Sequence, residues 1–472
     1  MCTQSVPVSQ NKETVQNKET PQKTIQLAIG EVSHFLEHAL QQFEPEAAPQ
    51  TRGRPRILPS LCLWGAMLFC LFRGGDSQLA LWRMIRHYGV FSYPPLDISD
   101  QAVYKRLETE GETPLQKLFL HVSALLEERL RLFEDRPDGY RLGGKLAPFA
   151  SEVVALDEMT LDQVRRTLPS LRGMPDGDDA RIPGKIAALF DVRRQQFRHI
   201  EFLEDFHQNC KQVARTVLAD LPPQALLLCD LGYFAFEFFD WLTDHQLFYI
   251  SRLRAKTSFT RLHVFYEKGQ TLDALVYLGA YRSDKAAHAV RLVQFRQGEA
   301  LRTYLTNVTD PQHLTLVDIA HLYARRWNIE SAFRLLKQYL HLHLLWSAKG
   351  VVVRQQLWCA LILAQVIHAL HWEIALRAGV DLFEVSLPLL LRYLPQYFAR
   401  HASGEAAITQ FVADGPSAGF IRASRRLQVA APQIAFECYK AAPPDLVTQR
   451  PSRHSHCKCG KNRNEQNRNE QK

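Results

Sequence analysis

The chain has 472 residues, of which 46% are hydrophobic and 22% charged, so it can bury a large core in roughly two to four soluble globular domains. Lysine and arginine outnumber aspartate and glutamate by eight, and the pI near 9.0 favours a polyanionic partner without requiring one. The nine cysteines are scattered and odd in number, which argues against a disulfide framework and fits buried thiols in a reducing cytosol.

Both ends of the chain are polar and repetitive. The tetrapeptide NKET occurs twice near the start, and NRNEQ occurs twice at the end. Neither end contains enough apolar surface to offset the entropy lost on ordering, so we expect disordered or weakly ordered tails and no secretory signal. The tract Cys457-Lys-Cys459 allows zinc binding, although its spacing differs from that of a CxxC knuckle.

A basic tetrapeptide precedes the first long apolar run. Arg52-Gly53-Arg54-Pro55 resembles the RGRP core of the AT-hook, an extended arm that places an arginine, here Arg54, in a narrow DNA minor groove. A basic linker before the next helix is the alternative. We therefore treat Arg54 as a candidate DNA contact.

A short helix is predicted across residues 99–107, because Val103 and Leu107 form an apolar seam at i, i+4. Lys105 and Arg106 are then free to face outward, as base- and phosphate-reading groups do on a recognition helix. A solvated helix face is the alternative. The surrounding region is predicted to be a helical DNA-binding domain.

Two later apolar runs each end in an aspartate, Asp157 and Asp230. Each run reads as a buried strand that delivers its aspartate to the C-terminal edge of a sheet. Two strands of one sheet would thus bring Asp157 and Asp230 side by side. Between them we expect an antiparallel pair of strands and then a helix, at 185–192, 196–202 and 209–219.

The stretch between Asp230 and the next candidate carboxylate is too long for a simple core. Its apolar residues alternate or cluster as in strands. We predict a β-rich insertion at 246–312, in which Arg252 and Arg254 suit a wall facing DNA.

A run of about twenty residues without proline or glycine, 321–340, predicts a helix. Tyr323, Arg326, Glu330 and Lys337 share one stripe of this helix, and Arg334 lies beside the stripe. A surface helix with one Glu330–Arg334 ion pair is one interpretation. The other is that Glu330 holds a metal ion while the cations grip phosphates.

The spacing Tyr323-x2-Arg326-x3-Glu330-x6-Lys337 resembles the YREK signature of DDE-type insertion-sequence transposases, which transpose by cut-and-paste. The order of strands and acidic residues also resembles the ribonuclease H-like core that these enzymes share with retroviral integrases. The resemblance implies an α/β fold: a ribonuclease H-like mixed sheet with flanking helices, interrupted by the β-rich insertion, plus helical N- and C-terminal regions.

The same resemblance implies a catalytic metal site. Asp157 would bridge two Mg²⁺ ions, or Mn²⁺ in their place, with Asp230 on one ion and Glu330 on the other. Water would cut the DNA, and the freed 3′ hydroxyl would attack the opposite strand and then the target. The remaining signature residues and their neighbour would position the DNA backbone: Tyr323, Arg326, Lys337 and Arg334.

The implied partners are double-stranded DNA, as transposon ends and target, and a second copy of the chain in a synaptic complex, in the bacterial cytoplasm at the nucleoid and not at a membrane. The insertion contains no tryptophan to stack on a flipped base, so Tyr304 and Phe259 are the substitutes there. Two alternatives stay open: a DNA-binding regulator that has lost cleavage, and a structure-selective nuclease that cuts without joining.

The apolar run at 357–376 is interrupted by polar residues, so we expect a buried helix and not a membrane span. The predicted division of the chain is a tail at 1–50, the helical DNA-binding domain at 51–145, the catalytic core at 146–245 and 313–377, the insertion at 246–312, a helical C-terminal region at 378–450 and a disordered basic tail at 451–472.

Overall fold

The computed structural model describes residues 32–43, 57–134, 146–161, 184–203, 205, 208–280, 285–342, 344–347 and 349–450. The predicted minor-groove arginine, Arg54, lies outside the described residues, and so do the C-terminal tail with its Cys457-Lys-Cys459 tract and most of the N-terminal tail.

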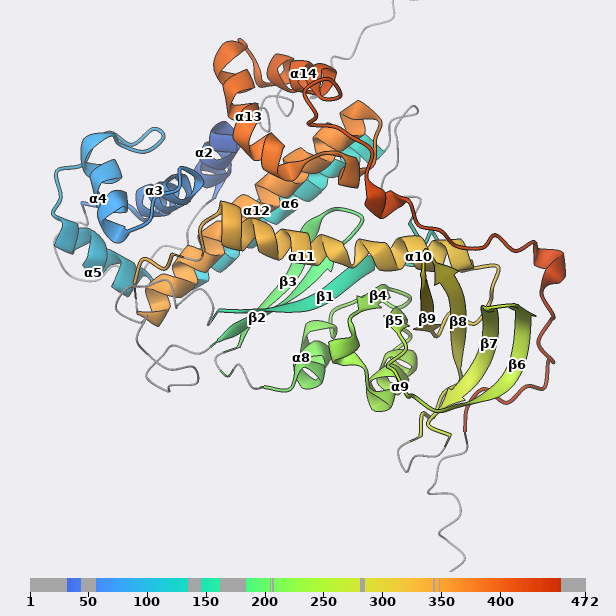
Figure 1. Ribbon diagram of the computed structural model, residues 1–472. Coiled ribbons are helices and arrows are strands. Elements are labelled where there is room, and N and C mark those ends of the chain that lie inside the picture. Colours follow the sequence, from blue (N-terminus) through green and yellow to red (C-terminus); the bar gives the residue numbers. More distant parts are fainter. Residues whose placement is uncertain are drawn as a thin grey trace, which may run out of the picture.

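A single nine-stranded mixed sheet runs through the molecule in the order β3-β2-β1-β4-β5-β9-β8-β7-β6 (Figure 1). The pairs β1–β4 and β4–β5 are parallel, and all the others are antiparallel. The strands are β1 Val153–Thr160, β2 Lys185–Asp191, β3 Gln196–Leu203, β4 Leu226–Cys229, β5 Phe248–Arg252, β6 Phe259–Lys268, β7 Thr271–Leu278, β8 Val290–Gln297 and β9 Ala300–Thr306.

The predicted insertion is continuous with the core sheet, because β9 pairs with β5. Its first strand, β5, pairs in parallel with β4 and therefore belongs to the core. The predicted start of the insertion at residue 246 therefore comes too early in the chain, because β5 belongs to the core. An apolar run such as Phe248–Arg252 fits a buried core strand and an insertion strand equally well, and only its neighbours distinguish them.

Helices cover both faces of the sheet around β1 and β4. On one face Val153 and Ala155 of β1 share a core with residues of α6, α10, α11 and α12, and on the other Val154 and Leu156 share a core with residues of α8 and α9. Successive strand residues point to opposite faces, so odd-numbered residues of β1 face α11. The helices are α2 Val32–Gln42, α3 Ser60–Phe72, α4 Gln78–His87, α5 Asp100–Glu110, α6 Thr113–Glu134, α8 Cys210–Val217, α9 Phe236–Asp244, α10 Leu316–Arg325, α11 Trp327–Arg334, α12 Gly350–Ala378, α13 Leu387–Arg400 and α14 Gly404–Asp414.

Helix α12 is the central helix of the helical layer. It is the one helix of the described residues long and apolar enough to cross a membrane, and 94% of its most apolar window is buried inside the protein. It packs against α6 and α3 (Figure 1). The predicted buried helix at 357–376 is therefore part of the core.

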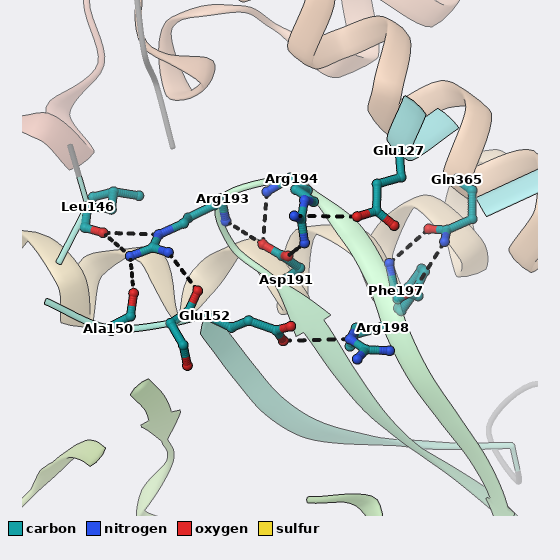
Figure 2. A network of polar contacts seen from close by, with 11 residues as sticks. Glu127, Leu146, Ala150, Glu152, Asp191, Arg193, Arg194, Phe197, Arg198 and Gln365 are labelled. Carbon is teal, nitrogen blue, oxygen red and sulfur yellow. Dashed lines mark hydrogen bonds and ion pairs between the residues drawn. The ribbon is translucent and has the colours of Figure 1, made fainter. Parts of the chain in front are cut away.

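A polar network fixes the turn between β2 and β3 (Figure 2). The Arg193 guanidinium donates hydrogen bonds to the carbonyls of Leu146 and Ala150, in the segment that leads into β1. Arg194 forms an ion pair with Glu127 of α6 at 3.4 Å. Because it links the start of β1 to the helical layer, this network sets the position of β1 against the helices.

The chain beyond α14 is extended, with short 3₁₀ turns at Arg425–Leu427 and Phe436–Cys438. Residues 421–450, which we call the C-terminal strap, cross α10 and continue to the β6 edge of the sheet (Figure 1). Backbone hydrogen bonds from Lys440 to Phe265 and from Arg450 to Ala287 attach the strap to the insertion. The prediction of a helical region as far as residue 450 is therefore wrong beyond Asp414.

Candidate active site

Asp157 and Asp230 lie next to each other because their strands pair in register. Leu156 is the partner of Cys229 in the parallel β1–β4 ladder, and each aspartate is the next residue. Asp157 shares the odd-numbered face of β1, and Asp230 shares the face of Leu226 and Leu228, so both side chains are on the α11 side.

The prediction that the first strand ends at Asp157 is wrong. β1 continues to Thr160, and Asp157 stays paired with Ala188 of β2. The parallel pairing of β1 with β4 ends one residue before Asp157, because the shorter strand β4 ends at Cys229. Both aspartates therefore lie where β4 ends.

The predicted helix at 321–340 consists of α10, α11 and a π-helical turn, Leu335–Tyr339. Arg326 joins α10 to α11 with helical dihedral angles, φ −53° and ψ −31°. The axis therefore continues across the junction, and α11 packs on β1. This places Glu330, in the first turn of α11, above the two aspartates.

The guanidinium group of Arg326 lies within 4.0 Å of all three carboxylates. Arg326 Nη2 donates to Glu330 Oε1 at 2.6 Å, its Nη1 lies 4.0 Å from Asp157 Oδ2, and its Nε lies 3.9 Å from Asp230 Oδ1. The Arg326 side chain is 8% exposed, whereas those of Asp157, Asp230 and Glu330 are 25%, 44% and 28% exposed. The buried cation thus lies behind three carboxylates that solvent reaches.

The charges of this cluster do not balance. Burial raises the pKa of Asp157 to about 6; the Glu158 N–H and Arg326 act in the opposite direction, and Asp230 and Glu330 raise the pKa further. Three carboxylates share one arginine, and Arg326 Nε is buried without a hydrogen-bond partner among the described residues. The site therefore has a deficit of positive charge and an unused donor.

The other signature residues surround this cluster. Tyr323 is 8% exposed and packs edge-on against Tyr304, with ring centroids 5.2 Å apart. Burial lowers the pKa of Lys337, and the charge of Asp157 opposes that shift. Arg334, one turn after Glu330, is exposed to solvent.

The candidate DNA contacts outside the helix differ in exposure. Lys105 is exposed on α5, as predicted for an outward-facing residue. The expectation that Arg106 faces outward is wrong, because its side chain is buried, donates to Ser60 Oγ at 2.8 Å and pairs with Glu110 at 2.6 Å. Arg254 is exposed next to the Asp230 turn, where it donates to the Leu231 carbonyl at 3.2 Å.

A basic groove of about 490 Å³ adjoins the carboxylates. Arg252 lines it, as does Trp327, which is 44% exposed and follows Arg326 directly. Tyr304 also lines the groove but is 3% exposed, and Phe259 packs against the core beneath the sheet. Trp327 was not predicted, although its place inside the signature was a signal, and neither was the place of these further cations in the groove: Arg302, Arg425 and Arg426.

The donor chemistry of the three carboxylates suits Mg²⁺, which prefers oxygen ligands and few carboxylates. In the conformation of the described residues, no group of three or more His, Cys, Asp or Glu side chains is arranged to hold a metal ion. Arg326 lies among the three carboxylates. Side-chain rotations at a fixed backbone would therefore be needed for the carboxylates to share an ion.

Comparison with known proteins identifies the same region. Residues 150–367, which contain all three carboxylates, match the family described as "Transposase DDE domain". The probable transposase for insertion sequence element IS5377 from Geobacillus stearothermophilus is 32% identical over 171 residues, which cover 34% of this chain and 44% of that protein. The putative transposase y4zB of Sinorhizobium fredii (strain NBRC 101917 / NGR234) is 26% identical over 195 residues, or 40% of this chain and 51% of that one.

The chain thus spans about half the length of these curated relatives. Among solved structures, the cryo-EM structure of a piggyBac transposase synaptic complex with hairpin DNA covers 87% of each chain at 9% identity and a TM-score of 0.38, a value too low to establish a shared fold. The family and relatives support a DDE transposase.

Proposed function

We propose, from the transposase DDE domain at residues 150–367, that this protein cuts and rejoins DNA at the ends of an insertion sequence by metal-dependent phosphoryl transfer. The observation that carries the proposal is the meeting of Asp157, Asp230 and Glu330 around Arg326. We assign the protein to the cut-and-paste group with the YREK signature, with a ribonuclease H-like core.

The three carboxylates would hold the divalent ions that the proposal requires, two Mg²⁺ with Mn²⁺ as a replacement. When bound, these ions neutralise charge on the attacked phosphate and on the leaving 3′ oxygen. The raised pKa of Asp157 is consistent with a site that gains stability from added positive charge. The partial exposure of all three side chains leaves them open to a DNA strand.

The cations around the site would position the DNA. Arg326 Nε–H is buried and has no hydrogen-bond partner among the described residues, and it would donate to a phosphate oxygen once its side chain turns out from behind the carboxylates. Lys337 is half-buried on the same helical axis and adds a second positive charge near Asp157. Tyr323 supports Arg326, whose guanidinium lies 5.9 Å from the Tyr323 ring centroid. These side chains orient the backbone and carry no proton in the reaction.

A supercoiled plasmid that carries the ends of the element tests the proposal. With Mg²⁺ the full chain should nick the plasmid and join the excised ends to a second DNA, and EDTA should abolish both reactions. Nicking without joining would identify a structure-selective nuclease. DNA binding without nicking would identify a regulator that has lost cleavage.

A further inference from the structure

A second cavity lies beneath α11, and the proposed reaction does not use it. It has a volume of about 310 Å³ and lies between α11, α12 and residues 382–388, with two residues of the C-terminal strap at its side. This volume is at the lower end of the range for pockets that hold small organic ligands.

The lining of the cavity includes a buried acceptor that has no partner among the described residues. Gln195 Nε2 donates to the Val192 carbonyl at 2.6 Å, so its Oε1 must accept, and Asn328 Nδ2 donates to it at 2.8 Å. These two bonds fix the orientation of the Asn328 amide. Asn328 is 3% exposed, and its Oδ1 has no hydrogen-bond partner in the described part of the chain.

A buried histidine lines the same cavity. His368 of α12 is 3% exposed, and its Nε2 also has no partner among the described residues. Burial, with a smaller effect of His371, lowers the pKa of His368 to about 3, so the ring is neutral near pH 7. Buried polar atoms of native proteins nearly always have a partner, and two atoms in one cavity that have none among the described residues indicate a polar occupant, either water or a ligand.

The solvent side of the cavity is cationic. Arg334, Arg422 and Arg426 line it and are all exposed, and Glu384 is the one acidic residue of the described lining. Glu384 Oε2 already accepts a hydrogen bond from the Asp381 N–H. The pKa of Arg426 is lowered by burial and then by the neighbouring charge of Arg334, and the charge of Glu330 opposes that shift. Like charges held close together favour a shared anion, and arginine is well suited to phosphate.

We propose that this cavity is a binding site for a nucleoside monophosphate. The phosphate contacts Arg334, Arg422 and Arg426, and a hydroxyl or amino group of the nucleoside donates to Asn328 Oδ1. The nucleotide is either free in solution or one unit of a bound DNA strand. None of the three carboxylates lines this cavity, but the cavity shares Arg426 with the basic groove and includes Arg334 of the signature helix.

Isothermal titration calorimetry of the full chain in EDTA, with deoxyadenosine monophosphate as the probe, tests the proposal. We expect a Kd of about 1 mM or tighter, at least about tenfold tighter than for inorganic phosphate or deoxyadenosine alone. Arg422→Gln should weaken binding about tenfold or more, because it removes a charged hydrogen bond. Arg83→Gln, a matched change of an exposed arginine on α4, should leave the Kd unchanged.

Asn328→Leu should also weaken nucleotide binding while the affinity for inorganic phosphate stays the same, and Arg422→Gln provides the test if this buried variant does not fold. Displacement of the nucleotide by a DNA duplex would identify a unit of DNA as the occupant, and simultaneous binding of both would identify the free nucleotide. No binding at millimolar concentration, or equal binding by wild type and Arg422→Gln, would overturn the proposal and leave water as the occupant.

Discussion

Two arginine–carboxylate clusters lie on the same sheet and differ in almost every physical property. In the insertion, Arg291 of β8 donates to both carboxylate oxygens of Asp273 on β7, at 2.8 and 2.6 Å, and to the Leu314 carbonyl at 2.7 Å. Both side chains are 0% exposed. In the candidate active site, Arg326 makes one short bond and two contacts near 4 Å with carboxylates that solvent reaches.

The difference separates an ion pair that stabilises the fold from a cluster that can act on a ligand. The Arg291–Asp273 pair is neutral as a whole, and its strongest hydrogen-bond donors have acceptors. An added ion would therefore not improve its charge balance. The three carboxylates of the Arg326 cluster exceed the arginine by two charges, which Lys337 offsets in part, and Arg326 Nε has no hydrogen-bond partner in the described part of the chain. Burial, with a smaller contribution from Asp230 and Glu330, raises the pKa of Asp157 and so disfavours its charged form in the absence of a cation.

The largest expected effect is on DNA cleavage. Asp157→Asn, Asp230→Asn or Glu330→Gln should each lower the cleavage rate about a thousandfold or more, since metal stabilisation of the transition state contributes several kcal/mol. DNA-end binding should persist, and the thermal unfolding midpoint should not fall in the two aspartate variants, whose contacts with Arg326 are 4.0 and 3.9 Å long; it should fall in Glu330→Gln, which loses the 2.6 Å ion pair with Arg326. Plasmid nicking and calorimetry measure these effects, with Asp220→Asn, an exposed aspartate outside the cluster, as the control. Retained cleavage in any of the three variants would remove that residue from the site.

The buried pair should behave in the opposite way. Asp273→Asn leaves the Arg291 charge buried without its carboxylate, which should cost about 3–5 kcal/mol of unfolding free energy. Urea denaturation at pH 7 measures this, beside Asp230→Asn, for which we expect no loss. Equal destabilisation by the two variants would contradict the distinction between the clusters.

Two buried histidines outside these clusters should make the free energy of unfolding depend on pH. Burial lowers the pKa of His368 to about 3 and of His371 to about 4, from an ordinary value of 6.5. The unfolded chain therefore binds more protons than the folded protein between pH 6.5 and these values, so stability falls as the pH falls. Between pH 7 and 5 the loss should be about 2 kcal/mol per histidine.

Denaturation of wild type and His371→Gln at both pH values isolates one histidine from the carboxylates. The variant should lose less stability than the wild type on acidification. The same loss in both proteins would show that His371 is not buried in its neutral form.

The smallest expected effect concerns DNA affinity. Lys337→Ala should weaken end binding and reduce the slope of log Kd against log salt by about one, because one phosphate contact is lost. Fluorescence anisotropy across a salt series measures the slope. Lys268→Ala, at the exposed end of β6, should leave the slope as it is in the wild type. An unchanged slope for Lys337→Ala would mean that this residue does not contact phosphate.

The sequence predicted the parts of the site that depend on local patterns. Apolar runs that end in Asp157 and Asp230 predict buried strands, and residues without helix breakers predict the helix that carries Glu330. The position of Arg326 among the carboxylates was not predicted: the i, i+4 rule was applied to Glu330 and Arg334, whereas the structure pairs Glu330 with Arg326. The alternation along β1 and β4 contained the missing signal, since it places both aspartates on the face that a covering helix must occupy.

The parts that could not be predicted depend on contacts between distant residues. The C-terminal strap is extended and carries no periodic pattern, and it is held by isolated pairings such as that of His288 with Gln449. Arg106 has the sequence context of an exposed helical residue, yet Ser60, 46 positions earlier, binds and buries it. Strand β5 has the composition of an insertion strand, and only its parallel pairing with β4 assigns it to the core.

Binding of Mn²⁺, followed by electron paramagnetic resonance of the free ion, tests most directly whether the three carboxylates form one metal site. Wild type and Asp220→Asn should bind the ion equally, and Asp157→Asn, Asp230→Asn and Glu330→Gln should each weaken binding about tenfold or more. The same Mn²⁺ affinity in wild type and in all three variants would contradict the account.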